Sequence, residues 1–85
     1  MRVRVRLFAR ARDLAGADAV DLDLAAGATA GDLRRWLAEA RPALAGLLER
    51  SALAVNNEFA DDSLTLPHNA EVALLPPVSG GAGAE

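Results

Sequence analysis

Polar and apolar residues alternate in the stretch RVRVRLF, residues 2–8. Val3, Val5 and Leu7 share one face of an extended chain, whereas three arginines and Phe8 share the other. A period of two residues is typical of a strand that buries one face. This stretch is therefore expected to form a strand whose aliphatic face joins the core.

The stretch AVDLDL, residues 19–24, repeats the alternation with Asp21 and Asp23 on its polar face. Between the two stretches lies RDLAGAD, residues 12–18, where Gly16 favours a hairpin connection. Arginines of the first strand would then pair with aspartates of the second. We prefer this interpretation to a phosphate-binding stripe, because the neighbouring carboxylates cancel the positive field.

The period changes in ATAGDLRRWLAEARP, residues 28–42. Apolar side chains recur at the spacing of a helix, at Leu33, Trp36, Leu37 and Ala40. Thr29 suits the N-cap position, and Asp32 suits the positive end of the helix dipole. Trp36 is expected in the core. Pro42 ends this helix and opens a short second one, whose inward-facing residues are Leu44, Leu47 and Leu48.

The second half of the chain returns to short extended pieces. A strand is expected at Leu53 and Val55, a turn at Asn56–Asn57 and a brief segment around Phe59. The last strand is EVALL, residues 71–75. Its alternation separates Val72 and Leu74 from Glu71, Ala73 and Leu75.

These elements predict an α+β domain, in which a mixed sheet of four to five strands carries one main helix and a short second helix. Eighty-five residues make one domain. We assign residues 1–77 to the domain and residues 78–85 to a flexible C-terminal tail. So small a chain has no room for a large enclosed active site, which favours a binding or carrier module.

Composition removes several classes of function. A net charge of −3 gives no electrostatic support for a nucleic-acid role. The sequence has no cysteine and no lysine, so disulfide, thiolate and Schiff-base chemistry have no side chain to use. A single histidine, His68, predicts no metal site, and no bound cofactor is expected. No apolar run approaches the roughly 20 residues that span a bilayer, so we expect a soluble, cytoplasmic protein.

The stretch ALLPPVSGGAGAE, residues 73–85, carries the remaining candidate chemistry. Pro76 and Pro77 cannot donate to a sheet, so they end the pairing and lead the chain outward in extended form. The segment from Pro76 to Gly81 could reach roughly 20 Å. Gly80 and Gly81 lack a Cβ, so they can enter a narrow channel and leave a carbonyl open to attack. A flexible linker accounts for the same composition.

Three stretches together resemble the small subunit of molybdopterin synthase, the MoaD-type members of the ubiquitin-like β-grasp group. They are LFARARDLAG, AVNNE and EVALLPPVSGG, at residues 7–16, 54–58 and 71–81. The resemblance covers residues 1–81 and implies a β-grasp fold. It also places Arg12, in the first stretch, among the partner-binding residues.

The resemblance implies a mechanism based on the main chain. An E1-like enzyme of the MoeB type would use ATP to adenylate the carboxylate of Gly81, and sulfur would replace AMP to give a thiocarboxylate. A MoaE-type large subunit would receive the tail, and the sulfur would build the dithiolene of the molybdenum cofactor. The chain would thus be a sulfur-donor subunit, not an enzyme on its own. Gly80, which has no side chain, would let the tail pass through a narrow channel of the partner. The residues that guide the tail would be Pro76, Pro77, Val78 and Ser79.

Strand parity adds an expected docking patch. Phe8 and Leu75 both lie opposite the core faces of their strands, and the first and last strands of a β-grasp sheet run parallel and adjacent. The two side chains should therefore be neighbours beside the tail, with Phe59 extending the patch. We expect this patch to bind the large subunit and, alternately, the activating enzyme. The competing interpretation is that these side chains belong to the core.

Residues 82–85, AGAE, depart from the family pattern, in which Gly81 would be last. Three explanations compete: removal by a protease, a fusion to the large subunit or a remnant of cloning, and loss of sulfur transfer in this member. We favour trimming or fusion. Two other functions stay open: a ThiS-like carrier for another pathway, such as thiazole synthesis or protein conjugation, and a β-grasp interaction module with an inert tail.

Overall fold

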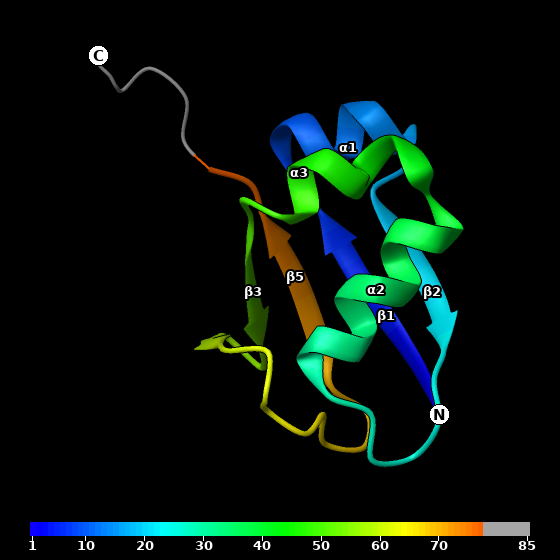
Figure 1. Ribbon diagram of the computed structural model, residues 1–85, viewed down its shortest axis with the longest axis vertical. Coiled ribbons are helices and arrows are strands. Elements are labelled where there is room, and N and C mark those ends of the chain that lie inside the picture. The colour runs from blue at the N-terminus through cyan, green and yellow to red at the C-terminus, as the bar shows by residue number, and fades with distance from the viewer. Residues whose placement is uncertain (78–85) are drawn as a thin grey trace.

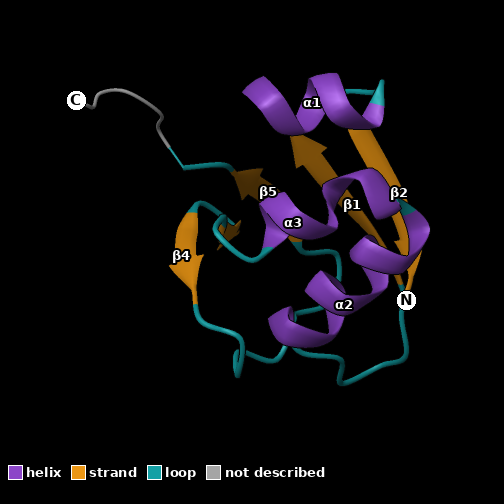
Figure 2. Cartoon of the chain, turned by 45° about the horizontal axis from the view of Figure 1, so that its top comes forward, coloured by secondary structure: helices purple, strands orange, loops and turns teal. Residues whose placement is uncertain are grey.

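The computed structural model describes residues 1–77, which form a two-layer α+β domain (Figure 1). A mixed sheet makes one layer, and the helices cover one of its faces (Figure 2). In chain order the elements are β1 (Arg2–Leu7), α1 (Ala9–Ala15), β2 (Ala19–Asp23), α2 (Ala30–Ala40), the 3-10 helix η1 (Pro42–Leu44), α3 (Ala45–Leu48), β3 (Ala52–Val55), β4 (Glu58–Ala60) and β5 (Glu71–Leu75). The predicted fold class is confirmed.

The five strands of the described chain lie in the order β2-β1-β5-β3-β4. β1 runs antiparallel to β2 and parallel to β5, so that Val5 lies opposite Val20 on one side and Val72 on the other. β3 is antiparallel to both β5 and β4. The first and last strands are therefore adjacent inside the sheet, as Figure 1 shows.

Alternate side chains of the inner strands meet the helices in the core. The fully buried residues include Val3, Val5, Val72 and Leu74 of the sheet and Leu33, Leu37, Leu44 and Leu48 of the helical layer. The parity predicted for these strands is confirmed. Burying one such side chain stabilises the fold by roughly 1.5–3 kcal/mol, so contact between the sheet and the helices is the main source of stability in a domain of this size.

A capping box begins helix α2. The Thr29 hydroxyl accepts a hydrogen bond from the Asp32 backbone N–H at 3.2 Å, and the Asp32 carboxylate accepts one from the Thr29 N–H at 3.0 Å. The bond from the Thr29 N–H holds the pKa of Asp32 below its usual value. The predicted N-cap is confirmed, and it fixes where the main helix starts across the sheet.

The connection between β1 and β2 is helix α1, where the sequence predicted only a hairpin turn. Gly16 ends the helix at a φ of 71°, and its N–H donates to the Arg12 carbonyl oxygen at 2.9 Å. Within the helix only Ala11 is buried. A single buried side chain in seven residues leaves no helical period in the sequence, which is why this element was missed.

Trp36 does not lie in the core, which corrects the prediction from the apolar stripe of α2. Its side chain is 52% exposed, whereas Leu33 and Leu37 are fully buried. The two leucines occupy the centre of the stripe, and Trp36 lies at its margin above β2. The described sheet ends at β2, so no further strand covers the indole ring.

The second helix begins as predicted at Pro42 and is divided into η1 and α3. Its leucines, Leu44, Leu47 and Leu48, are buried. Asn56 and Asn57 form the expected turn between β3 and β4, with φ angles of 52° and 70°. Among residues 1–77, no helix has the length and apolar character needed to cross a membrane.

Arginines of β1 pair with aspartates of β2, as the alternation predicted. Arg4 Nε lies 2.9 Å from Asp21 Oδ1, and Arg2 Nε lies 3.5 Å from Asp23 Oδ1. The hydrogen bond from Arg4 lowers the pKa of Asp21. Because all four side chains are exposed, these pairs help to define the register more than they stabilise the fold.

Replacing Thr29 by Ala should lower the free energy of unfolding by about 1 kcal/mol, because the first turn of α2 loses its side-chain acceptor. Denaturant titration of the wild type, Thr29→Ala and Thr29→Ser measures this loss, and the serine variant should retain most of the stability. Thr65→Ala, at an exposed position, serves as the control. An equal loss in both alanine variants would contradict the capping role.

Candidate partner-docking surface

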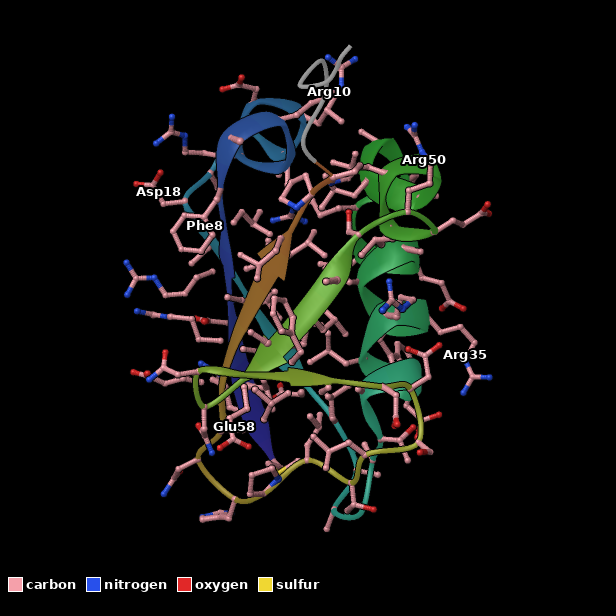
Figure 3. All side chains as sticks on the ribbon, turned by 90° about the vertical axis from the view of Figure 1, so that its left-hand side faces the viewer. Phe8, Arg10, Asp18, Arg35, Arg50 and Glu58 are labelled. Atoms are coloured by element: carbon pink, nitrogen blue, oxygen red, sulfur yellow. The ribbon has the colours of Figure 1, made fainter. Side chains whose placement is uncertain are left out.

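Phe8 leaves the sheet on the face opposite the helices, as Figure 3 shows. It follows the last residue of β1 in extended conformation, with φ −129° and ψ 157°, so the strand alternation carries its side chain outward. Ala9 then adopts a φ of 51°, which turns the chain into α1. A residue with a Cβ in this left-handed region costs roughly 1–2 kcal/mol. The Phe8 ring stays 43% exposed.

Leu75 and Phe59 reach the same face from β5 and β4. Leu75 follows Leu74, which is fully buried, and is itself half-buried because its side chain points the other way. Phe59 is 78% exposed and pairs with Ala54 of β3. These large apolar side chains remain accessible on a small domain, which is typical of an interaction surface.

The three side chains line one groove of about 300 Å³ on the open face of the sheet. Its lining residues are Phe8, Ala54, Asn57, Phe59, Ala73 and Leu75. We call this surface the apolar groove. It brings Phe8, Phe59 and Leu75 together as strand parity predicted, although whether the groove binds a partner stays a prediction.

Two alanines make the floor of the apolar groove. Ala54 of β3 lies opposite Ala73 of β5, so the smallest side chains face each other where larger ones would fill the space. The sequence analysis placed Ala73 on the outer face and Asn57 in a turn, but it assigned none of Ala54, Ala73 and Asn57 to the docking patch. The alternation of ALAV, in which Leu53 and Val55 point inward, already placed Ala54 on the outer face.

A second hollow, of about 170 Å³, adjoins the apolar groove and shares several of its residues. It adds Arg6 and Glu71, two side chains that are exposed on the outer face. An apolar centre with a charged margin is the usual anatomy of a protein interface. The open face of β1, β5 and β3 is therefore suited to a protein partner.

The structure does not bring Arg12 into the apolar groove. This side chain lies on α1, where its Nε is 4.0 Å from Asp18 Oδ1. Arg12 is absent from the lining of both hollows on the open face. The role in partner binding that the resemblance implied for it stays a prediction.

β5 leads from Leu75 into Pro76 and Pro77, which are half-buried and exposed, respectively. The chain therefore leaves the sheet beside the apolar groove. The remaining residues assigned to the tail site, Val78, Ser79, Gly80 and Gly81, lie outside the described residues.

Within residues 1–77, no cluster of three His, Asp or Glu side chains could hold a metal ion. The two carboxyl groups with lowered pKa values, Asp21 and Asp32, lie at β2 and at the start of α2, away from the apolar groove. The two carboxyl groups whose pKa values are lowered are thus separate from the apolar groove.

The fold defines a ubiquitin-like β-grasp domain. Residues 5–81 match the ThiS family, and the chain belongs to this family.

The chain is similar to proteins that are named sulfur carrier subunits or small archaeal modifier proteins. It is 37% identical over 79 residues to the molybdopterin synthase sulfur carrier subunit of Arabidopsis thaliana, covering 93% of this chain and 82% of that protein. It superposes on the crystal structure of SAMP1 from Haloferax volcanii with a TM-score of 0.86 and 31% identity, covering 95% of this chain and 100% of that one. It superposes on a chain of the complex of subunits 1 and 2 of the molybdopterin-converting factor from Helicobacter pylori with a TM-score of 0.68 and 26% identity, over 95% and 100% of the two chains.

Proposed function

We propose that this protein is the sulfur carrier subunit of a molybdopterin synthase. The observation that carries the proposal is that the family match runs through the diglycine and ends at Gly81. The curated relative from Arabidopsis thaliana bears the same functional name. The apolar groove beside Pro76 supports it, because a carrier must dock on its partners while its tail reaches into them.

The proposed chemistry takes place at the carboxylate of Gly81, after removal of residues 82–85. An E1-like enzyme transfers AMP from ATP to this carboxylate and releases pyrophosphate. A sulfur nucleophile then attacks the acyl carbon and expels AMP, which leaves a thiocarboxylate. The sequence has no cysteine, so no side-chain thiol of this chain competes for the activated acyl group.

The proposed partner in the second step is the large subunit of molybdopterin synthase. The structure from Helicobacter pylori is a complex of subunits 1 and 2 of the molybdopterin-converting factor, and this chain superposes on one of its chains. We propose that the large subunit binds the apolar groove and that the E1-like enzyme binds the same groove at a different time. Shared use of one surface would separate loading from delivery of the sulfur.

A second candidate function is covalent protein modification. It is favoured by the TM-score of 0.86 with SAMP1, and a second structure from the same organism, with a TM-score of 0.82, is named small archaeal modifier protein 1. The activation step would be the same, but an amine of a target protein would attack the acyl carbon in place of sulfur. This chain has no lysine, so its own side chains offer no amine for chain formation.

A chain ending at Gly81 should be adenylated by an E1-like enzyme of a molybdopterin system, whereas the 85-residue chain should not be. The reason is that the shorter form ends in glycine, which has no side chain, whereas the 85-residue form ends in Glu85. ATP–pyrophosphate exchange measures the reaction, and a chain ending at Gly80 is the matched control. Equal activity of the 81- and 85-residue forms would contradict removal of residues 82–85, and no activity of either would contradict the carrier role.

Leu75→Asp should weaken binding to the large subunit by about 30-fold or more while the protein still unfolds cooperatively, because a charge then lies in the apolar groove. Isothermal titration calorimetry measures binding, and thermal unfolding monitors the fold. Leu74→Asp, one residue away on the buried face, should unfold the domain. If Leu75→Asp unfolds it as well, the side chain is core and the docking assignment is wrong.

The two candidate functions should differ in the product that the activated chain forms. We expect the 81-residue chain, incubated with ATP, the E1-like enzyme and cell extract, to gain the mass of one oxygen-to-sulfur exchange. Intact-mass spectrometry detects this change. Covalent adducts with other proteins, resistant to denaturation and thiols, would instead support protein modification.

A further inference from the structure

The outer edge of β2 offers free backbone groups. Within residues 1–77, β2 pairs with β1 on one side and has no strand on the other. The Leu24 N–H donates to the Met1 carbonyl oxygen at 2.7 Å, and the Leu7 N–H donates to the Asp18 carbonyl oxygen at 2.8 Å. Because backbone groups alternate in direction along an antiparallel strand, residues 18, 20, 22 and 24 direct theirs toward β1. The N–H and C=O groups of Ala19, Asp21 and Asp23 therefore point away from the sheet. Such an edge can pair with a further strand.

A groove of about 320 Å³ runs between this edge and helix α2. Its lining residues are Asp21, Leu22, Asp23, Trp36, Glu39 and Ala40. The Trp36 ring is 52% exposed, and Glu39 is exposed beside it. The groove thus combines an aromatic ring, the Glu39 carboxylate and an open strand edge, and nothing in the proposed sulfur chemistry uses it. The Asp21 and Asp23 side chains lie along the same edge on the outer face, where each pairs with an arginine of β1.

We propose that this edge groove is a second docking site, which binds an extended segment of a partner protein with alternating basic and aliphatic residues. Added to β2, the segment places the residues opposite Asp21 and Asp23 on the outer face, where basic side chains meet the carboxylates. The residue between them points to the helical layer, where an aliphatic side chain covers Trp36. The partner strand is thus specified as basic, aliphatic, basic.

The chain already contains this pattern on the inner side of β2. Arg4 lies opposite Asp21 and Arg2 opposite Asp23, with Val3 between them on the core face. A strand on the other side of β2 would meet the same two aspartates, and its basic side chains would share these carboxylates with Arg2 and Arg4. A strand like RVRVR therefore fits the alternation of β2 from either direction.

Charge favours a basic partner over a second copy of this chain. Pairing of two β2 edges in antiparallel orientation would bring Asp21 and Asp23 of one copy close to those of the other, which is destabilising. Glu39 adds a further negative charge to the groove, and the whole chain carries −3. The same carboxylates attract lysine or arginine.

The edge groove and the apolar groove can be occupied together. β2 lies at one edge of the sheet, whereas the apolar groove spans β5, β3 and β4 toward the opposite edge. A partner on β2 would hold the domain while Leu75 and the tail engage another protein. This inference does not depend on whether the tail carries sulfur.

The edge groove can be tested with a peptide, Gly-Arg-Val-Arg-Val-Arg-Gly with blocked ends, added to the full chain. Trp36 is the single tryptophan, so its fluorescence reports binding at the groove. We expect saturable binding that weakens as salt rises from about 50 to about 500 mM. A peptide of the same composition with its three arginines adjacent should bind at least about fivefold more weakly, because it cannot alternate. Equal binding of the two peptides, or none of the first, would overturn the proposal.

Two variants separate charge from strand pairing. Glu39→Arg should weaken the peptide about fivefold, whereas Glu58→Arg, the same charge change on β4, should leave binding unchanged. Asp23→Pro removes an outward N–H and should weaken binding further than Asp23→Asn, which removes only the charge. If Asp23→Pro lowers thermal stability markedly, the Glu39 and Glu58 pair still decides. An equal loss of peptide affinity in Glu39→Arg and Glu58→Arg would contradict the proposed occupant. So would a dimer of the free chain that forms with rising concentration and becomes more stable in Glu39→Arg.

Discussion

Parallel pairing between β1 and β5 is the constraint on which the apolar groove depends. Leu7 lies opposite Leu74 in this pair, so the next residues in the two strands, Phe8 and Leu75, continue side by side. Parallel strands have their carboxyl ends on the same side of a sheet. The turn from β1 into α1 therefore lies beside the step from β5 into Pro76. One backbone pairing thus places an exposed aromatic ring beside the start of the tail.

The same alternation lets these strands serve the core and the surface at once. Val5, Leu7, Val72 and Leu74 bury one face of the pair, and this face determines the register because a one-residue slip would expose them. Once the register is set, the positions of the side chains on the other face are determined as well. Ala54 and Ala73 leave a hollow there, and Phe59 stays 78% exposed at its margin. Core packing therefore shapes the apolar groove indirectly.

Sequence patterns predicted the parts of the fold that repeat over several residues. The strands at residues 2–8 and 71–75, the α2 stripe and the Thr29 cap were confirmed because each combines a clear period or a specific terminal residue. The pattern did not reveal α1, whose only buried side chain is Ala11. Trp36 was misplaced because a helix period gives the centre of a stripe but not how far the sheet extends beneath its margin. Ala54 and Ala73 were not assigned to the docking patch, because strand alternation gives the face of a small side chain but not the hollow that it leaves.

The two edge strands of the described sheet differ in length and in charge. β4 has three residues, too few to template a long strand, whereas β2 has five and carries Asp21 and Asp23 on its outer face. Length limits pairing with any strand, but charge limits pairing only with strands of the same sign. In the proposed arrangement the β2 edge disfavours a second β2 and accepts a basic segment, to which the exposed indole of Trp36 offers an apolar contact. Because β5 lies in the middle of the sheet, a segment bound at the β2 edge would leave the apolar groove and the end of β5 accessible.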